Sequence, residues 1–217
     1  MKGDRMKTRV LSAKILANAD RALLKQLGVP EGHRSLGFIT TDCDDVGYAA
    51  LDEATKKAEV AVAYARSMYA GASNASTALA GEFIGILSGP DPEEVKSGIE
   101  AFVSYVENDA AFVSANDDDS IVYFAHCISR TGSYLSKAAD VPEGTAMAYL
   151  IAPPLEAMMG LDAALKAAGV TLRVFYGPPS ETNFAGGLLT GEQSACVSAC
   201  EAFAETVCSI AAAPLKY

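Results

Sequence analysis

The sequence predicts an α/β protein, a tandem α+β sandwich made of two similar halves, and three observations predict it. Short apolar strands alternate with amphipathic helices along the whole chain. A stretch of ten residues recurs: residues 51–60 read LDEATKKAEV and residues 161–170 read LDAALKAAGV, with six identical positions. Finally, 50% of the 217 residues are hydrophobic and only 20% are charged, which is enough apolar material for packed cores.

In the first half, apolar residues at helical spacing predict a long first helix that ends at Gly28. Asp44 or Asp45 can cap the second helix, and Pro92 lies in the first turn of the third. Apolar runs between the helices predict strands, and a run of small residues predicts a loop. The expected elements are helices 8–27, 45–58 and 91–108, strands 35–41, 59–69 and 82–89, and a loop over 70–81.

The same order of elements recurs in the second half: strand, helix, strand, loop, short strand and a long final helix. Between the two halves we expect one more strand, followed by a Gly/Ser-rich connection in which SRTGSYLS (129–136) forms a turn. The expected elements are strands 121–129, 146–153, 170–176 and 188–191, helices 154–168 and 191–211, and a loop over 177–187.

The flanks of the repeated helix support an internal duplication. In both halves the strand after it ends on a tyrosine, the loop that follows closes with Ala-Gly (80–81 and 185–186), and the last helix contains Glu-Ala-Phe (100–102 and 201–203). We therefore predict two domains, 1–110 and 111–217. Two packed copies of one domain reproduce an interface that a homo-oligomer would make.

Composition excludes several classes of function. The formal charge of −10 argues against nucleic acid as a partner and suits small cationic ligands. Five cysteines without framework spacing fit reduced thiols in the cytoplasm, and two histidines with no tryptophan are a small inventory for acid–base catalysis. No run of 18 apolar residues and no signal-peptide pattern is present, so we expect no membrane segment. The mean hydropathy of +0.17 suggests apolar surface covered by partners.

Four long segments carry a resemblance to a known family: RSLGFITTDCDDVGYAALDEATKKAEVAVAYARSMYAG, SRTGSYLS, AYLIAPPLEAMMGLDAALKAAGV and PPSETNFAGG. Over essentially its whole length the chain resembles the shell proteins of ethanolamine-utilisation bacterial microcompartments, of the tandem-domain trimeric type. The resemblance implies two circularly permuted microcompartment domains and a flat pseudo-hexameric homotrimer. It also implies edge-to-edge packing with other shell proteins, a structural role without enzymatic activity, and a place in the microcompartment shell.

The acidic run DCDD (42–45) lies where the first predicted strand meets a helix. Helix capping and a solvated turn would explain it without any ligand. The resemblance instead implies a small pore in each subunit that binds and transports ethanolamine. In that reading Asp44, Asp45 and Glu82 hold the ammonium and hydroxyl groups, and Phe112 contributes its backbone carbonyl or its ring. Residues Thr182, Asn183 and Phe184 complete the pore.

Two corresponding loops, 70–80 and 177–184, are expected to gate a larger central pore, because the resemblance places them near the three-fold axis. Small residues give the first loop backbone freedom, whereas two prolines stiffen the entry to the second. Ordinary surface hairpins are the alternative interpretation. We expect ligand binding at the small pore to favour the closed state of these loops. The gate residues are Gly71, Ser73, Asn74, Ser76, Pro178, Pro179, Ser180 and Glu181.

No cofactor is required by this interpretation, and two ligands are secondary possibilities. Glu156 and Glu181, gathered around a three-fold axis, would suit a divalent metal such as zinc, although ordinary surface glutamates are commoner. If the chain is a shell protein, a further role is to bind cobalamin, the cofactor of the lyase enclosed in the microcompartment. Such a site would need a large apolar crevice.

Two other classes of protein remain open from sequence. One is a non-shell sensor or carrier of small molecules, which would share the acidic pocket. The other is a thiol enzyme that uses Cys127, but neighbouring strand residues point to opposite faces, so His126 cannot activate it directly. Three further cysteines lie on one face of the last helix, where we expect them to be buried core residues: Cys196, Cys200 and Cys208.

Overall fold

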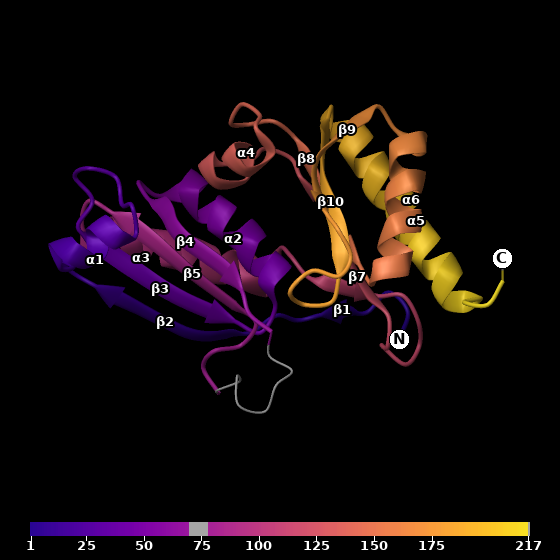
Figure 1. The fold of residues 1–217 in the computed structure, drawn as a ribbon, viewed down its shortest axis with the longest axis horizontal. Coiled ribbons are helices and arrows are strands. Elements are labelled where there is room, and N and C mark those ends of the chain that lie inside the picture. Colours follow the sequence, from indigo (N-terminus) through magenta and orange to yellow (C-terminus); the bar gives the residue numbers. More distant parts are fainter. Residues whose placement is uncertain (70–77, 217) are drawn as a thin grey trace. The chain divides into compact units, whose positions relative to one another are not determined.

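The computed structural model describes residues 1–69 and 78–216, which divide into two compact units (Figure 1). The N-terminal unit contains Lys7–Ala110 and Gly132–Leu135. The C-terminal unit contains Met1–Met6, Ala111–Thr131 and Ser136–Tyr217. The chain leaves the first unit between residues 110 and 111, where the sequence predicts the domain boundary. A single boundary at this point would place Met1–Met6 in the N-terminal unit and Gly132–Leu135 in the C-terminal unit. Each of these short segments instead belongs to the other unit.

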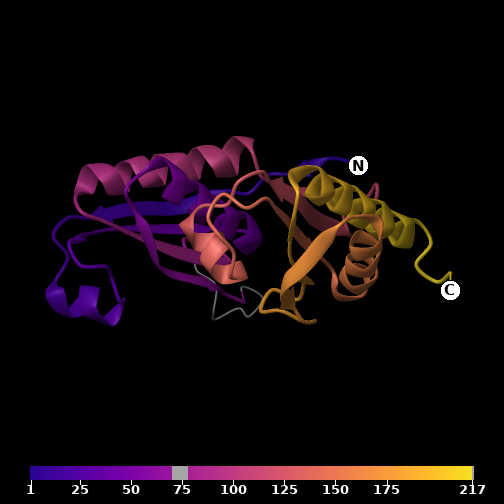
Figure 2. The same ribbon diagram turned by 90° about the horizontal axis from the view of Figure 1, so that it is seen from above.

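The N-terminal unit is an antiparallel four-stranded sheet of order β2-β3-β5-β4, with α2 and α3 packed on it and on each other (Figures 1 and 2). The two central strands are the most buried, and side chains such as Leu36 of β3, Leu87 of β5 and Phe102 of α3 are inaccessible to solvent. Its elements are β2 (Val10–Leu16), α1 (Arg21–Gln26), β3 (Ser35–Thr41), α2 (Asp44–Lys57), β4 (Ala61–Ser67), β5 (Phe83–Gly89) and α3 (Pro92–Asn108).

The C-terminal unit is a six-stranded antiparallel sheet of order β1-β6-β7-β8-β10-β9, with α5 and α6 packed on it. Its core gathers Leu150 and Leu189 of the sheet with Leu161 of α5 and Phe203 of α6. The first turn of α4 belongs to the N-terminal unit. The elements are β1 (Arg5–Met6), β6 (Phe112–Ser114), β7 (Val122–Ile128), α4 (Ser133–Ala139), β8 (Met147–Ala152), α5 (Pro154–Ala167), β9 (Val170–Tyr176), β10 (Ala185–Gly191) and α6 (Gln193–Ala212).

The two units share one topology, because β2-β3-β5-β4 corresponds strand by strand to β7-β8-β10-β9. Each edge strand also has an irregular register near its start, between Val62 and Tyr64 in β4 and between Leu172 and Val174 in β9. The predicted α/β class is therefore confirmed, and the repeated sequence corresponds to a repeated arrangement of strands and helices.

The helix predicted over residues 8–27 is wrong. Val10–Leu16 form a strand, and only Arg21–Gln26 are helical. Antiparallel pairing with β3, interrupted between Val10 and Ser12, satisfies the backbone groups of β2 that face β3, and this tertiary pairing overrides a weak helical periodicity. The helix begins only after Asp20, whose side chain accepts the backbone N–H of Ala22.

Smaller corrections concern the second half and the short strands. The segment SRTGSYLS contains the start of helix α4 and is not a simple turn, and the strand predicted at 188–191 begins at Ala185. The Ala-Gly pairs are not equivalent: the first residues of β5 and β10, Phe83 and Ala185, both pair with the last residue of the neighbouring strand, so Gly186 corresponds to Ile84 and not to Gly81. Strands β1 and β6 were not predicted, because their few residues carry no periodicity.

Within residues 1–69 and 78–216, only α6 is long and apolar enough to cross a membrane, judged by length and composition alone. A core helix of a soluble protein satisfies the same criterion. One face of α6 is buried in the core of the C-terminal unit through Cys196, Phe203 and Val207, whereas Glu201 and Glu205 are exposed. The helix thus packs one face on the core of the C-terminal unit.

Candidate functional site

Three carboxylates gather where β3 ends and α2 begins, and we call Asp44, Asp45 and Glu82 the acidic corner. Thr41, the last residue of β3, pairs with Phe83, the first residue of β5. The backbone N–H of Glu82 donates to the carbonyl of Thr41 at 3.0 Å, so Glu82 lies beside the start of α2. Antiparallel pairing therefore brings together acids that are far apart in sequence.

The capping residue expected for α2 is wrong by one position. Cys43 is the N-cap, without a side-chain capping bond, and Asp44 and Asp45 lie in the first turn. The Asp44 carboxylate accepts the backbone N–H of Asp45 at 2.9 Å. Carboxylates in the first turn interact favourably with the helix dipole, so this position partly offsets the cost of concentrating negative charge.

Close backbone packing holds the corner together. Gly81 has a φ of +63°, and a Cβ there would collide with the carbonyl oxygen of Thr41. A Cβ at Gly47, in the first turns of α2, would collide with the ring of Phe83. Glycine at both positions lets the end of β3, the start of α2 and the start of β5 approach one another closely.

Burial and neighbouring charge make the corner electrostatically unusual. Asp44 and Asp45 are buried. Burial raises the pKa of Glu82, and the charges of Asp44 and Asp42 raise it further. Burial also raises the pKa of the Cys43 thiol, with Asp45 adding to the effect. A small cation at this corner would stabilise the ionised carboxylates.

Asp42, the first acid of DCDD, has a different role. Its carboxylate accepts the backbone N–H of Arg9 and pairs with the Arg9 Nε, each at 2.7 Å. The pair ties the residue before β2 to the end of β3. This contact was not predicted, because the segment that contains Arg9 was expected to be helical.

The remaining predicted pore residues lie in the C-terminal unit. Phe112 is buried, and its ring centroid lies 5.6 Å from that of Phe184, edge to face. Residues 180–184 form a tight turn in which the backbone N–H of Ser180 donates to Phe184 O at 2.7 Å and that of Asn183 donates to Ser180 O at 3.1 Å. The structure thus brings Phe112 and Phe184 together; one pore built from both units stays a prediction.

Four of the predicted gate residues, Gly71, Ser73, Asn74 and Ser76, lie outside the described residues. In the second loop Pro178 and Pro179 are joined by a cis peptide bond. Glu181 is exposed there, and Glu156 lies in the first turn of α5. Within the described part of the chain no three His, Cys, Asp or Glu side chains gather as a metal ion would require. The metal expected at Glu156 and Glu181 depends on several copies of the chain and stays a prediction.

The cysteines have the environment of core residues. Cys196 and Cys200 are buried in the C-terminal unit, and Cys208 packs against the same core, as the sequence predicts. Burial raises the pKa of Cys127, whereas a nucleophilic cysteine needs a lowered one. The neighbouring His126 stacks on Phe124, with ring centroids 5.2 Å apart. These features argue against a thiol enzyme at Cys127.

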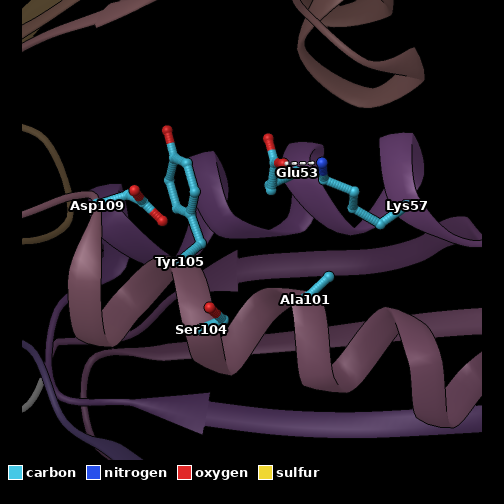
Figure 3. Close-up of a pocket in the computed structure, with 6 residues that line it drawn as sticks. All are labelled: Glu53, Lys57, Ala101, Ser104, Tyr105 and Asp109. Carbon is cyan, nitrogen blue, oxygen red and sulfur yellow. Dashed lines mark ion pairs between the residues drawn. The ribbon is translucent and has the colours of Figure 1, made fainter.

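A groove of about 560 Å³ between α2 and α3 was not predicted from sequence (Figure 3). Glu53 and Lys57 line it from α2, with their charged groups 3.6 Å apart. On the other side it is lined by Ala101, Ser104 and Tyr105 of α3 and by Asp109, the C-cap of that helix. A groove of about 490 Å³ lies between α5 and α6 and has an apolar lining that includes Leu155, Met159 and Ile210.

Comparison with known proteins agrees with this architecture. The model of the BMC domain matches residues 35–117. The bacterial microcompartment shell protein EutL of Clostridium perfringens is 62% identical over 217 residues, covering both chains completely. The chain belongs to the EutL family of bacterial microcompartment shell proteins. The family resemblance expected from the sequence is thus confirmed, and so is a place in a microcompartment shell.

Solved structures support the fold independently. The ethanolamine utilization protein EutL of Leptotrichia buccalis, 67% identical, superposes with a TM-score of 0.97 and complete coverage of both chains. A trimeric bacterial microcompartment shell protein, PduB, is only 18% identical but has a TM-score of 0.74, covering 94% of this chain and 89% of its own. The likeness to PduB shows that the fold tolerates extensive change of sequence.

Proposed function

We propose that three copies of this chain form a flat tile of an ethanolamine-utilisation microcompartment shell and that the acidic corner binds ethanolamine as a cation. The observation that carries the ligand proposal is the gathering of Asp44, Asp45 and Glu82, where burial and then the charges of Asp44 and Asp42 raise the pKa of Glu82. An ammonium group supplies positive charge and several hydrogen-bond donors for these carboxylates. The small size of ethanolamine suits a corner at which the end of β3 and the starts of α2 and β5 pack closely.

Family membership supports the structural part of the proposal. A shell protein needs apolar surface for neighbours and no catalytic machinery, and both agree with the composition and the raised pKa of Cys127. The family argues against the alternative of a non-shell sensor or carrier. Loop gating of a central pore and docking of cobalamin belong to the same proposal as predictions from the resemblance.

Calorimetry tests the ligand site. In the double variant Asp45→Asn with Glu82→Gln, we expect ethanolamine to bind about a hundredfold more weakly, because two charge-assisted hydrogen bonds are lost. Glu107→Gln with Glu201→Gln removes the same charge from exposed helical positions and serves as the control. Equal affinity of the double variant and the unmodified protein would exclude the acidic corner as the site.

Electron microscopy tests the assembly. Purified protein at high concentration should form flat hexagonal arrays, because tiles that pack edge to edge extend in two dimensions. Discrete trimers under every condition would contradict the shell proposal without affecting the calorimetric result. The two experiments therefore separate assembly from ligand binding.

A further inference from the structure

Two short helices of the chain, α1 and α4, are equivalent elements. Each follows the first strand of the repeated topology, β2 or β7, and each leads into a segment that reads Val-Pro-Glu-Gly, at residues 29–32 and 141–144. Their ends have the same hydrogen bonds: Val29 N donates to Leu24 O at 3.1 Å, and Val141 N donates to Ser136 O at 3.0 Å. By this alignment Leu23 of α1 corresponds to Leu135 of α4.

Helix α2 receives the first turn of α4 within the N-terminal unit. The Asp52 carboxylate accepts the backbone N–H groups of Gly132 at 2.7 Å and Leu135 at 2.8 Å. The Thr55 hydroxyl accepts the backbone N–H of Ser133 at 3.1 Å. Asp52 is completely buried, and Leu135 is 2% exposed. Asp52, a residue of α2, thus caps the N-terminus of α4.

The equivalent surfaces on α1 and α5 are exposed in the single chain. The repeated sequence of α2 and α5 makes Asp162 equivalent to Asp52 and Leu165 equivalent to Thr55. The Asp162 side chain is 62% exposed, and Leu165 is 38% exposed. Leu23, which corresponds to the buried Leu135, is 39% exposed. Both partners of the equivalent contact therefore carry an exposed leucine.

We propose that α1 of one copy of the chain packs on α5 of the next copy, with Leu23 against Leu165 and Arg21 beside Asp162. The inference rests on the trimer of the proposed function and identifies one of its contacts. A contact between two different surfaces is head-to-tail, and it closes into a ring when the rotation between copies permits. The two leucines bury apolar surface, and the arginine supplies a charge opposite to that of Asp162.

The proposed contact between α1 and α5 differs in chemistry from the observed contact between α4 and α2, and the difference follows from the residues at the equivalent positions. A Cβ at Gly132 would collide with the Thr55 hydroxyl, so α4 approaches α2 closely enough for backbone hydrogen bonds. Asp20, which has a side chain, occupies the position equivalent to Gly132 and caps α1 itself. The approach of α1 to α5 is therefore wider. Leucine in place of Thr55 provides an apolar contact suited to that wider spacing.

Disulfide cross-linking tests the contact. The variant Leu23→Cys with Leu165→Cys, mildly oxidised, should give covalent species of two and three chains on a denaturing gel. The single variants and the pair Glu107→Cys with Leu165→Cys are controls, which should remain single chains. Sedimentation of each unoxidised protein establishes its oligomeric state in the same experiment.

The outcomes separate this inference from the trimer itself. Specific two- and three-chain species from a sedimenting trimer support the contact. A trimer in which the leucine positions cross-link no more than the control pair overturns the contact and leaves the trimer intact. A protein that sediments as a single chain at every concentration overturns both the trimer and the contact.

Discussion

Asp52 and Asp162 occupy the same position in two copies of one helix, and each is followed four residues later by a lysine. Asp52 is buried and accepts two backbone N–H groups, while its lysine lies 3.6 Å away. Asp162 is exposed and pairs with Lys166 at 2.6 Å. The comparison shows that a repeated local sequence specifies the helix, whereas the segment that packs on the helix determines the role of its side chains.

The corners at the start of the two helices differ in the same manner. In the N-terminal unit, Asp44 and Asp45 open α2 beside Glu82. The equivalent positions are Pro154 and Leu155, which open α5, and Phe184, which precedes β10 as Glu82 precedes β5. Duplication thus preserved the scaffold while charge remained in one corner only. The helix–helix grooves diverged as well, polar in one unit and apolar in the other.

Substitution of the two aspartates should give the largest difference in stability between equivalent positions. Asp52→Asn is expected to lower the free energy of unfolding by about 2 kcal/mol, because an amide cannot accept both N–H groups without placing its own NH₂ against one of them. Asp162→Asn should change it by less than about 0.5 kcal/mol, since it removes only an exposed helical ion pair.

Urea denaturation measures this difference, and hydrogen exchange localises it. Faster exchange of the Gly132 and Leu135 amides is expected in the Asp52 variant alone. Equal losses of stability in the two variants would refute the distinction between them.

The caps of α3 and α6 should give a smaller difference. Asp91 accepts the backbone N–H groups of Glu93 and Glu94, each at 2.9 Å, whereas the equivalent Glu192 makes no side-chain capping bond. Asp91→Ala should therefore cost about 1 kcal/mol of unfolding free energy, and Glu192→Ala close to none. Thermal unfolding of both variants provides the measurement, and a larger loss for Glu192→Ala would contradict the assigned caps.

The smallest effect concerns pH. Because the pKa of Glu82 is raised, its carboxyl takes up a proton at a higher pH than an ordinary glutamate. Ethanolamine, a cation in this range, should bind the ionised form, so its affinity should fall as pH falls through that raised pKa. Calorimetry across pH should show the fall in the unmodified protein and a weaker dependence in Glu82→Gln. A pH dependence identical in both would show that Glu82 does not couple to the ligand.

Much of the fold could be predicted from local sequence. Apolar periodicity predicts the strands β3 and β5 and the helices α2, α3 and α5, and the repeated residues predict the duplication. The acids at 44 and 45 could be identified as a candidate site by their clustering alone. Glu82 could be joined to them only through the family resemblance, because antiparallel pairing of β3 with β5 is a long-range property.

The sequence by itself determined that this chain contains two copies of one α/β unit, with negative charge at the start of one helix. Only the tertiary structure decided that Val10–Leu16 form a strand, that Asp52 is buried and that Glu82 lies beside α2. The physical reason is that periodicity and capping are local, whereas burial and hydrogen-bond partners depend on segments distant in the chain. Identical residues at 52 and 162 therefore have different environments.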